Sequence, residues 1–292
     1  MKGLVTIFLT IMTFTLSGCT GCNPPWPWPS PSPTPVPDFG TIIKTLPASH
    51  NGIGSIDLVD GSIWEYCQGH AELRKRDMDG DLQEIVELDG RLTGLWAVCW
   101  DPQRSAFWCT NPDIKNFESE NGNLIKVNRQ GGVIQVIRVS DNWGKPYLTI
   151  RDIDYNDNYE YEDADGNKIT KGLLRTADWH YSLRKCDYID PDNGFWETFW
   201  WRLSDIQHAA VTEAGGKYYA STDGDNPING EYPILESDQV GRKQWAPNTG
   251  RQIVVPGVWF SSLKTEGRSL WGKGIRKSDN QTLIYQISLG ES

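Results

Sequence analysis

The sequence lacks the local motifs that identify several common enzyme and cofactor-binding classes. It contains no G-x-S-x-G nucleophile motif, no P-loop, no dinucleotide-binding glycine fingerprint and no H-E-x-x-H motif. These absences exclude the recognisable forms of α/β-hydrolases, nucleotide-binding proteins and zinc metalloproteases.

Positive charge is also scarce. The chain has 28 Lys and Arg against 38 Asp and Glu, a formal net charge of −10. An acidic protein is repelled by phosphate backbones, and no basic run with interleaved aromatic residues occurs. We therefore exclude nucleic acid as a partner.

Cysteines are few, and none of those beyond the N-terminal segment has the spacing of a metal site. Four of them lie in the later part of the chain, at Cys67, Cys99, Cys109 and Cys186. We expect no zinc from this pattern and assign no metal ligand. Cys99 and Cys109 flank one predicted hairpin, so a disulfide between them and buried free thiols both stay open.

One apolar run near the N-terminus, Leu4–Leu16, follows Lys2 and is too short to span a bilayer comfortably. It ends in Leu16-Ser-Gly-Cys19, which resembles the lipobox of bacterial lipoproteins. The resemblance implies that residues 1–18 are a signal peptide and that Cys19 carries lipid. Thr20 in place of Asp implies the outer membrane as the location in a Gram-negative source. An ordinary secretory signal is the alternative.

Proline dominates the next segment, residues 23–37. Such a composition cannot build a core and favours an extended polyproline II spacer. We therefore expect three parts: a signal peptide (1–18), a lipid-anchor Cys with a Pro-rich linker (19–37), and one folded domain (38–292). The tryptophans, fourteen in all, lie in this last part except for Trp26 and Trp28.

The folded part contains a repeat. In Gly122–Val139, apolar and polar residues alternate on both sides of a Gly131-Gly132 turn, which predicts a hairpin. Four other stretches have the same shape. The predicted four-strand units occupy residues 55–88, 94–139, 148–201, 206–255 and 258–288.

The last unit is one strand short, and Asp38–Leu46 matches the missing strand. An N-terminal strand that completes the last blade is the arrangement of a closed β-propeller. The sequence thus predicts an all-β propeller of about five four-stranded blades; a further blade within 148–206 would make six. In the fourth blade we expect a long loop, Thr222–Gln239, and then a third strand at Arg242–Trp245.

The turn Trp100-Asp-Pro-Gln103 before an aromatic strand resembles those of YWTD, NHL and SMP-30 propellers. The resemblance is at the level of the repeat and extends over the folded part. It implies a ligand face formed by the loops that enter each first strand and those that join each second strand to the third.

Sorting the loops by that rule places several polar and aromatic residues on the predicted ligand face. The candidate ligand-binding residues are His50, His70, Asp178, Trp179, His180, His208, Asp223 and Asp225. Together they would bind a polar ligand, and a divalent metal stays open as a cofactor. The alternative is that they are solvated loop residues.

Three aspartates, Asp57, Asp152 and Asp154, lie on predicted first strands, where five-bladed glycoside hydrolases carry catalytic carboxylates. They are the catalytic candidates if the protein is an enzyme. Aspartates that cap turns or line a wet channel are the alternative.

Two functions follow from these observations. The first is a membrane-tethered, non-catalytic propeller that binds a glycan, a peptide or a partner protein through its His/Asp/Trp face. The second is an exported hydrolase, either a glycosidase or a metal-dependent lactonase-like enzyme with its site in the central funnel. A scaffold role in envelope assembly is a third reading.

Overall fold

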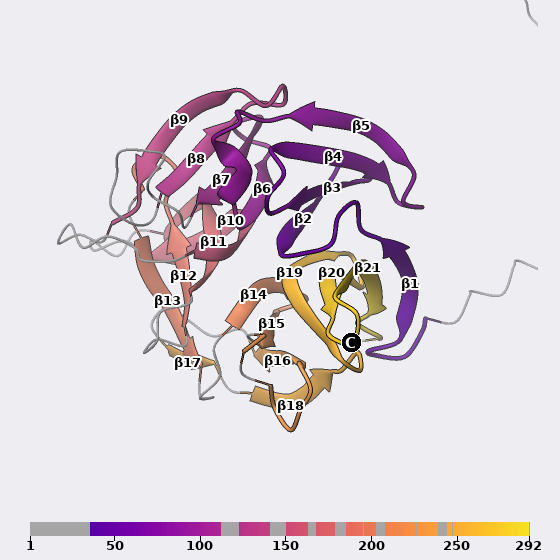
Figure 1. The fold of residues 1–292 in the computed structure, drawn as a ribbon. Coiled ribbons are helices and arrows are strands. Elements are labelled where there is room, and N and C mark those ends of the chain that lie inside the picture. Colours follow the sequence, from indigo (N-terminus) through magenta and orange to yellow (C-terminus); the bar gives the residue numbers. More distant parts are fainter. Residues whose placement is uncertain are drawn as a thin grey trace, which may run out of the picture. The chain divides into compact units, whose positions relative to one another are not determined.

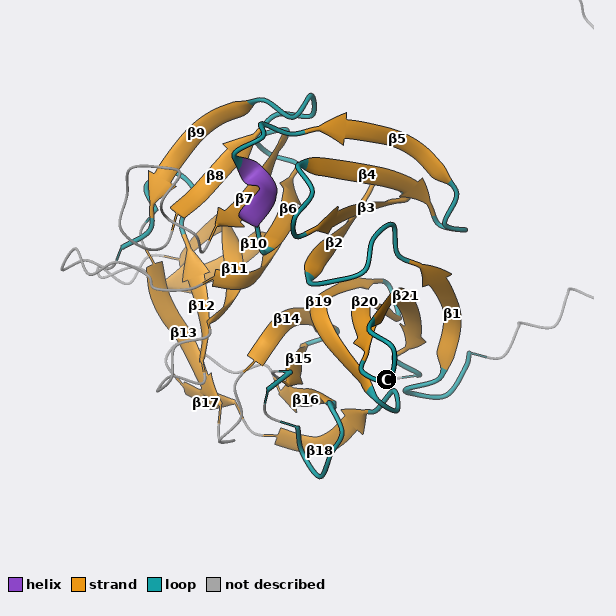
Figure 2. Cartoon of the chain, in the orientation of Figure 1, coloured by secondary structure: helices purple, strands orange, loops and turns teal. Residues whose placement is uncertain are grey.

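The computed structural model describes residues 36–111, 123–140, 150–162, 168–178, 185–194, 196–202, 208–222, 224–225, 227–238, 244–246 and 248–291. They belong to one compact unit, Val36–Ser292. Within these residues the regular structure is strand, apart from a single 3-10 turn, η1 (Leu92–Gly94) (Figure 2). Among the residues described, no helix has the length and apolar character needed to cross a membrane.

Five antiparallel blades form a ring (Figure 1). Blade 1 consists of β2 (Gly54–Val59), β3 (Ser62–Cys67), β4 (Glu72–Asp77) and β5 (Leu82–Glu87). Blade 2 consists of β6 (Ala97–Asp101), β7 (Ala106–Asn111), β8 (Asn123–Val127) and β9 (Val133–Arg138). Blade 3 consists of β10 (Ile150–Glu162), β11 (Lys168–Asp178), β12 (Lys185–Ile189) and β13 (Trp196–Arg202).

Blade 4 consists of β14 (His208–Ala214), β15 (Lys217–Thr222), β16 (Ile234–Asp238) and β18 (Asn248–Ile253). Blade 5 consists of β19 (Val258–Glu266), β20 (Ser269–Arg276), β21 (Gln281–Ser288) and β1 (Ile42–Pro47). The predicted five-bladed propeller is confirmed. All the described strands within residues 148–206, where a sixth blade could have been hidden, belong to blade 3.

The N-terminal strand closes the ring, as predicted. β1 pairs antiparallel with β21, with Lys44 opposite Gln286 and Leu46 opposite Ile284. This pairing covers the edge that β21 would otherwise expose, and an exposed apolar edge is a site of association. The two ends of the described chain therefore meet in one blade.

The third strand of blade 4 differs from the prediction. It is β16, which begins at Ile234, within the stretch expected to be a loop. Ile234 and Leu235 are buried, and Tyr219 of the neighbouring strand donates a hydrogen bond to Glu236. The segment expected there instead forms β17 (Gln244–Ala246), which pairs in parallel with β13 of blade 3. Because Ile234 and Leu235 are buried, their segment forms the third strand. In the segment expected there, Arg242–Trp245, Trp245 is the only apolar residue, which is a weaker sequence signal for a strand.

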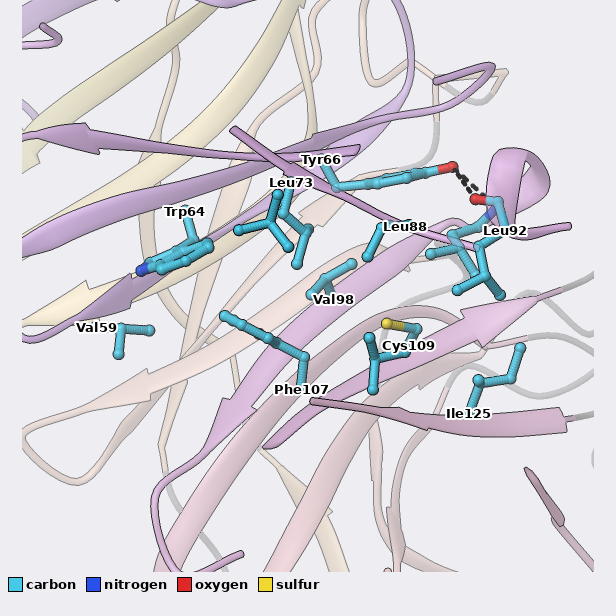
Figure 3. Packing of buried hydrophobic residues seen from close by; sticks show 13 residues of the cluster. Val59, Trp64, Tyr66, Leu73, Leu88, Leu92, Val98, Phe107, Cys109 and Ile125 are labelled. Atoms are coloured by element: carbon cyan, nitrogen blue, oxygen red, sulfur yellow. Dashed lines mark hydrogen bonds between the residues drawn. The ribbon is translucent and has the colours of Figure 1, made fainter. Parts of the chain in front are cut away.

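The hydrophobic core lies between neighbouring blades. Between blades 1 and 2, the ring centroids of Trp64 and Phe107 are 5.0 Å apart (Figure 3). The hydroxyl of Tyr66 donates toward the carbonyl oxygen of Leu92 at 3.0 Å and accepts from the backbone N–H of Leu95 at 3.2 Å. These contacts attach the turn η1 to blade 1 and position the start of blade 2.

The disulfide between Cys99 and Cys109 does not form. Cys99 lies opposite Trp108, and Cys109 lies opposite Val98. Because side chains alternate between the two faces of a sheet, this register points the two thiols away from each other. Cys67, Cys99 and Cys109 are buried free thiols, the second of the two expected alternatives.

The first strands of the five blades, β2, β6, β10, β14 and β19, each contact the first strands of the blades on either side. They therefore line the central axis (Figure 1). We call the end of the axis where these strands begin the entry face, and the end where they finish the exit face. The entry face is the predicted ligand face.

Candidate functional site

A pocket lies on the axis at the entry face. It has a volume of about 210 Å³ and is lined by Ile53, Trp96, Arg151, Ala209, Gly224, Asp225, Trp259, Ser261 and Lys277. Every blade contributes, through the start of its first strand or the segment just before it. Two connections between second and third strands add Asp225 from blade 4 and Lys277 from blade 5.

Two cation–aromatic pairs form the walls of this pocket. The guanidinium carbon of Arg151 lies 4.8 Å from the ring centroid of Trp96. The Nζ of Lys277 lies 5.1 Å from the centroid of Trp259 and 5.3 Å from that of Tyr232. Each pair holds a positive charge at the wall, since a cation is attracted to the face of an aromatic ring.

Trp259 also carries a hydrogen-bond donor that needs a partner. Its side chain is buried, with 6% of its surface exposed, and no described residue accepts a hydrogen bond from its indole Nε1. A buried N–H without a partner costs about 1–3 kcal/mol. Gly224 packs against the same ring, so closely that an added Cβ would lie 2.8 Å from it. The glycine therefore lets the blade 4 connection reach the pocket.

A second cluster on the entry face joins His50, His70 and Glu72. The two imidazole rings stack with centroids 3.6 Å apart and an angle of 7° between their planes. The Nε2 of His50 lies 2.8 Å from the Oε1 of Glu72. Arg74 donates from its Nε to the same oxygen at 2.6 Å. The structure thus brings together two of the predicted residues and adds a carboxylate that sequence reasoning missed.

The three candidate catalytic aspartates converge on one buried lysine, Lys264 of β19. Its Nζ lies 3.3 Å from the Oδ1 of Asp154 and donates a hydrogen bond to the carbonyl oxygen of Ile153. Asp57 and Asp152 also face this ammonium, whose charge opposes the rise in pKa that burial causes in each carboxyl. Lys264 was not among the site residues predicted from the sequence.

Other contacts tie each aspartate to a different blade. Asp154 accepts hydrogen bonds from Arg175 at 2.8 Å and from Thr212 at 3.0 Å. Asp152 accepts from the hydroxyl of Ser262 at 3.2 Å and from the backbone N–H of Leu263 at 3.3 Å.

The Oδ2 of Asp57 accepts from the backbone N–H of Trp100, which links blade 1 to blade 2. The cluster therefore connects first strands across the axis.

Burial separates the pKa values of the three carboxyls. Burial raises the pKa of Asp57 to about 6 and that of Asp152 to about 7, against the opposing effect of Lys264. Burial also acts on Asp154, but Lys264 and Arg175 hold its pKa below the ordinary value. Burial would lower the pKa of Lys264, yet the aspartates hold it above its usual range. Such a separation is found in acid–base sites and in structural ion networks alike.

A cavity of about 270 Å³ adjoins this cluster toward the exit face. It is lined by Asp57, Leu58, Trp100, Pro102, Asp154, Tyr155, Lys264 and Thr265. Asp152 is absent from this lining and is fully buried. Asp57 and Asp154 therefore open toward the exit face, and none of the three aspartates lines the entry pocket.

The predicted ligand-binding residues thus divide into groups. Asp225 lines the entry pocket, and His50 and His70 form the neighbouring cluster. Asp178 ends β11 and His208 begins β14. Four predicted residues lie outside the described part of the chain: Cys19, Trp179, His180 and Asp223.

Sequence reasoning missed Trp96, Arg151, Trp259 and Lys277, which form most of the pocket wall. Trp96, Arg151 and Trp259 share one signal, because each lies at the start of a predicted first strand. This position belongs to a strand, so sorting the loops by face does not reveal it.

No protein-family model matches the chain, and no curated protein matches it. Among solved structures, the exo-β-1,3-galactanase 1,3Gal43A of Clostridium thermocellum is 16% identical, with a TM-score of 0.50 over 86% of this chain and 62% of that one. The exo-β-1,3-galactanase of Phanerochaete chrysosporium is 11% identical, with a TM-score of 0.50 over 85% of this chain and 63% of that one.

Virginiamycin B lyase of Staphylococcus aureus is 10% identical, with a TM-score of 0.45 over 82% of each chain. This chain spans less than two thirds of the length of either galactanase. At these identities the galactanases show a shared propeller fold and nothing of function. The resemblance to YWTD, NHL and SMP-30 propellers stays a prediction.

Proposed function

We propose that the protein is a binding module that takes a negatively charged glycan into the entry pocket. The observation that carries this proposal is the set of donors at the pocket wall. Arg151 and Lys277 supply positive charge, and Trp259 supplies a buried N–H without a partner among the described residues. Glycans that carry carboxylates offer both the oxygen acceptors and the charge that these groups would bind.

The charge of the pocket stands out against that of the whole chain. The protein has a formal net charge of −10, yet among the described residues that line the pocket there are two cations, Arg151 and Lys277, and one carboxylate, that of Asp225. A local positive pocket on an acidic protein attracts anionic groups and repels cationic ones. A uronic acid residue combines an anion with ring hydroxyls. The carboxylate of Asp225 would accept a hydrogen bond from one of these hydroxyls.

The size of the pocket limits what enters it. Drug-sized ligands occupy sites of about 300–1,000 Å³, and this pocket has about 210 Å³. A single sugar residue at the end or on a branch of a chain fits this description better than an extended segment. The rest of such a chain would lie over the entry face.

The hydrolase alternative has less support. Its candidate carboxylates are engaged in hydrogen bonds between blades, and Asp152 does not line the exit-side cavity. Inverting and retaining glycosidases need two carboxylates on either side of an accessible bond. The separated pKa values of Asp152 and Asp154 are the observation in favour of that alternative.

The proposal includes the sequence-based tether. If Cys19 carries lipid, the Pro-rich linker would hold the module at a distance from the outer membrane. A tethered module with a glycan pocket would retain polysaccharide at the surface of the cell.

An array of neutral and uronic acid-containing glycans tests the proposal, followed by calorimetry with the best ligand. We expect binding to the acidic glycans. A hydrogen bond to a charged group contributes about 1.5–3 kcal/mol, so Lys277→Ala should weaken binding by about tenfold or more. Trp259→Phe removes the indole N–H, keeps an aromatic ring, and should weaken binding less.

Lys75→Ala is the matched control. Lys75 also lies over a tryptophan, with its Nζ 5.9 Å from the ring centroid of Trp64, but it is remote from the entry pocket. It should bind as the wild type does. Equal losses in both lysine variants would contradict the assignment of the pocket. Release of shortened oligosaccharides, detected by mass spectrometry, would favour the hydrolase instead.

A further inference from the structure

His50, His70 and Glu72 lie on adjacent connections of blade 1, outside the entry pocket. His50 belongs to the connection between β1 and β2, His70 to the connection between β3 and β4, and Glu72 is the first residue of β4. One ligand atom from each lies within 4.8 Å of the others. The alternating pleat sends residues two apart to the same side of an extended chain, as at positions 70 and 72.

Hydrogen bonds fix the backbone that carries these side chains. The N–H of Gly69 donates to the carbonyl oxygen of Thr93 at 2.7 Å, and the N–H of His70 donates to that of Cys67 at 3.2 Å. Next to His50, the Oδ1 of Asn51 accepts from the N–H of Thr282 at 2.9 Å. His50 therefore projects from a segment anchored to β21, and His70 from a turn anchored to β3 and η1.

The side chains are partly open to solvent. The side chain of His50 is 26% exposed and that of Glu72 is 16% exposed. Arg74 holds the Oε1 of Glu72 at 2.6 Å, which orients the carboxylate. An ion can reach these groups from solvent, and a carboxylate held by a neighbouring donor is typical of metal ligands with outer-sphere support.

From this geometry we propose that His50, His70 and Glu72 form a site for a divalent transition metal, with zinc as the best match. Imidazole nitrogen and carboxylate oxygen are both zinc ligands, and two histidines with one glutamate leave a fourth position open. Zinc binds an unprotonated ring nitrogen, so ligation breaks the hydrogen bond between His50 and Glu72, and the proton moves to the other ring nitrogen or to solvent. Ligation also turns the imidazoles out of their stack. These are side-chain rotations, and the backbone positions stay fixed.

The site is independent of the proposed glycan pocket. The two sites are connected through the chain by Ile53, which lines the pocket and follows His50 by three residues. Zinc binding and glycan binding can each be measured without the other. A protein that binds no zinc can still bind the glycan, and a protein that binds no glycan can still bind zinc, so the two proposals are tested separately.

Isothermal calorimetry with zinc chloride tests the site, using the full-length chain without a polyhistidine tag. We expect a saturable binding event that the double variant His50→Ala/His70→Ala lacks. Loss of an outer-sphere partner alone costs about 10–100-fold in metal affinity. Each single variant, and Glu72→Gln, should therefore weaken this event by about tenfold or more.

Glu84→Gln is the matched control, because Glu84 is an exposed carboxylate on β5 of the same blade. It should bind zinc as the wild type does. Thermal unfolding in the presence of chelator should give the same midpoint for all variants, which shows that the fold is kept. Absence of saturable binding by the wild type, or an equal binding event in the double variant, overturns the proposal.

Discussion

At the scale of the residue, the buried lysine explains why three inward aspartates can coexist. Lys264 and Arg175 compensate Asp154, while Asp57 and Asp152 keep raised pKa values. Breaking a buried ion pair typically costs about 3–5 kcal/mol, because it leaves one charge unpaired. Substitution of any one of these charged residues is therefore expected to destabilise the fold. This holds whether or not the aspartates are catalytic.

The pKa of Asp152 leads to a prediction about stability and pH. Its folded value, about 7, exceeds the ordinary value of 3.8, so the folded protein keeps a proton that the unfolded chain releases. The stability from this group is therefore complete at low pH and is lost as pH rises from about 4 through about 7. Asp152→Asn should flatten this decline, since its amide can still bond Ser262 and Leu263.

Urea unfolding at several pH values measures this effect. One pKa unit corresponds to about 1.4 kcal/mol, so the curves for wild type and variant should diverge by more than about 1 kcal/mol. Asp279→Asn is the control, because its exposed carboxyl has a pKa lowered by Arg276 and titrates below this range. Parallel curves for wild type and Asp152→Asn would refute the assignment.

The sequence predicted part of this cluster. Asp57, Asp152 and Asp154 were expected on first strands because the repeat defined those strands. Lys264 was not, since it lies more than a hundred residues from Asp154 and only ring closure brings the two together. Glu72 was missed for a related reason: its partner His50 belongs to a different connection.

At the scale of the element, glycine turns control how blades approach each other. Gly131 in the β8–β9 turn has φ +86°, and an added Cβ would lie 1.8 Å from the carbonyl oxygen of Glu87 in blade 1. Gly215 in the β14–β15 turn has φ +55°, with nothing within 4 Å of an added Cβ. Substituting each of the two glycines therefore distinguishes the free-energy cost of backbone strain alone from the added cost of a clash between blades.

Gly215→Ala should cost about 1–2 kcal/mol, the usual penalty for an L-residue in the left-handed region. Gly131→Ala should cost clearly more, because the backbone of blade 1 has to move as well. Chemical unfolding of both variants measures the difference. Equal costs would mean that the approach of Gly131 to Glu87 contributes nothing to stability.

Strand assignment from sequence worked where alternation and turns agreed, as in Gly122–Val139. It failed in blade 4, where a long polar loop was expected to continue through Ile234 and Leu235. Only the partner strand shows that these residues are buried. Register, which separates Cys99 from Cys109, was likewise not readable from spacing.

At the scale of the whole molecule, ring closure by β1 should decide the oligomeric state. Deleting residues 36–47 exposes the edge of β21, where Leu283, Ile284 and Ile287 are otherwise buried. We expect self-association and a lower unfolding midpoint, measured by light scattering and urea unfolding. A chain that starts at Val36 is the control and should behave as the full-length protein does. A monomeric deletion variant with an unchanged midpoint would contradict this role.

The meeting of the two chain ends in blade 5 also sets an order in time. During synthesis β1 leaves the ribosome before the other strands of the propeller, and its partner β21 leaves last. Pairings between distant segments form slowly because loop closure opposes them. The nascent protein therefore carries β1 without its partner until β21, the last strand of the propeller, has been synthesised.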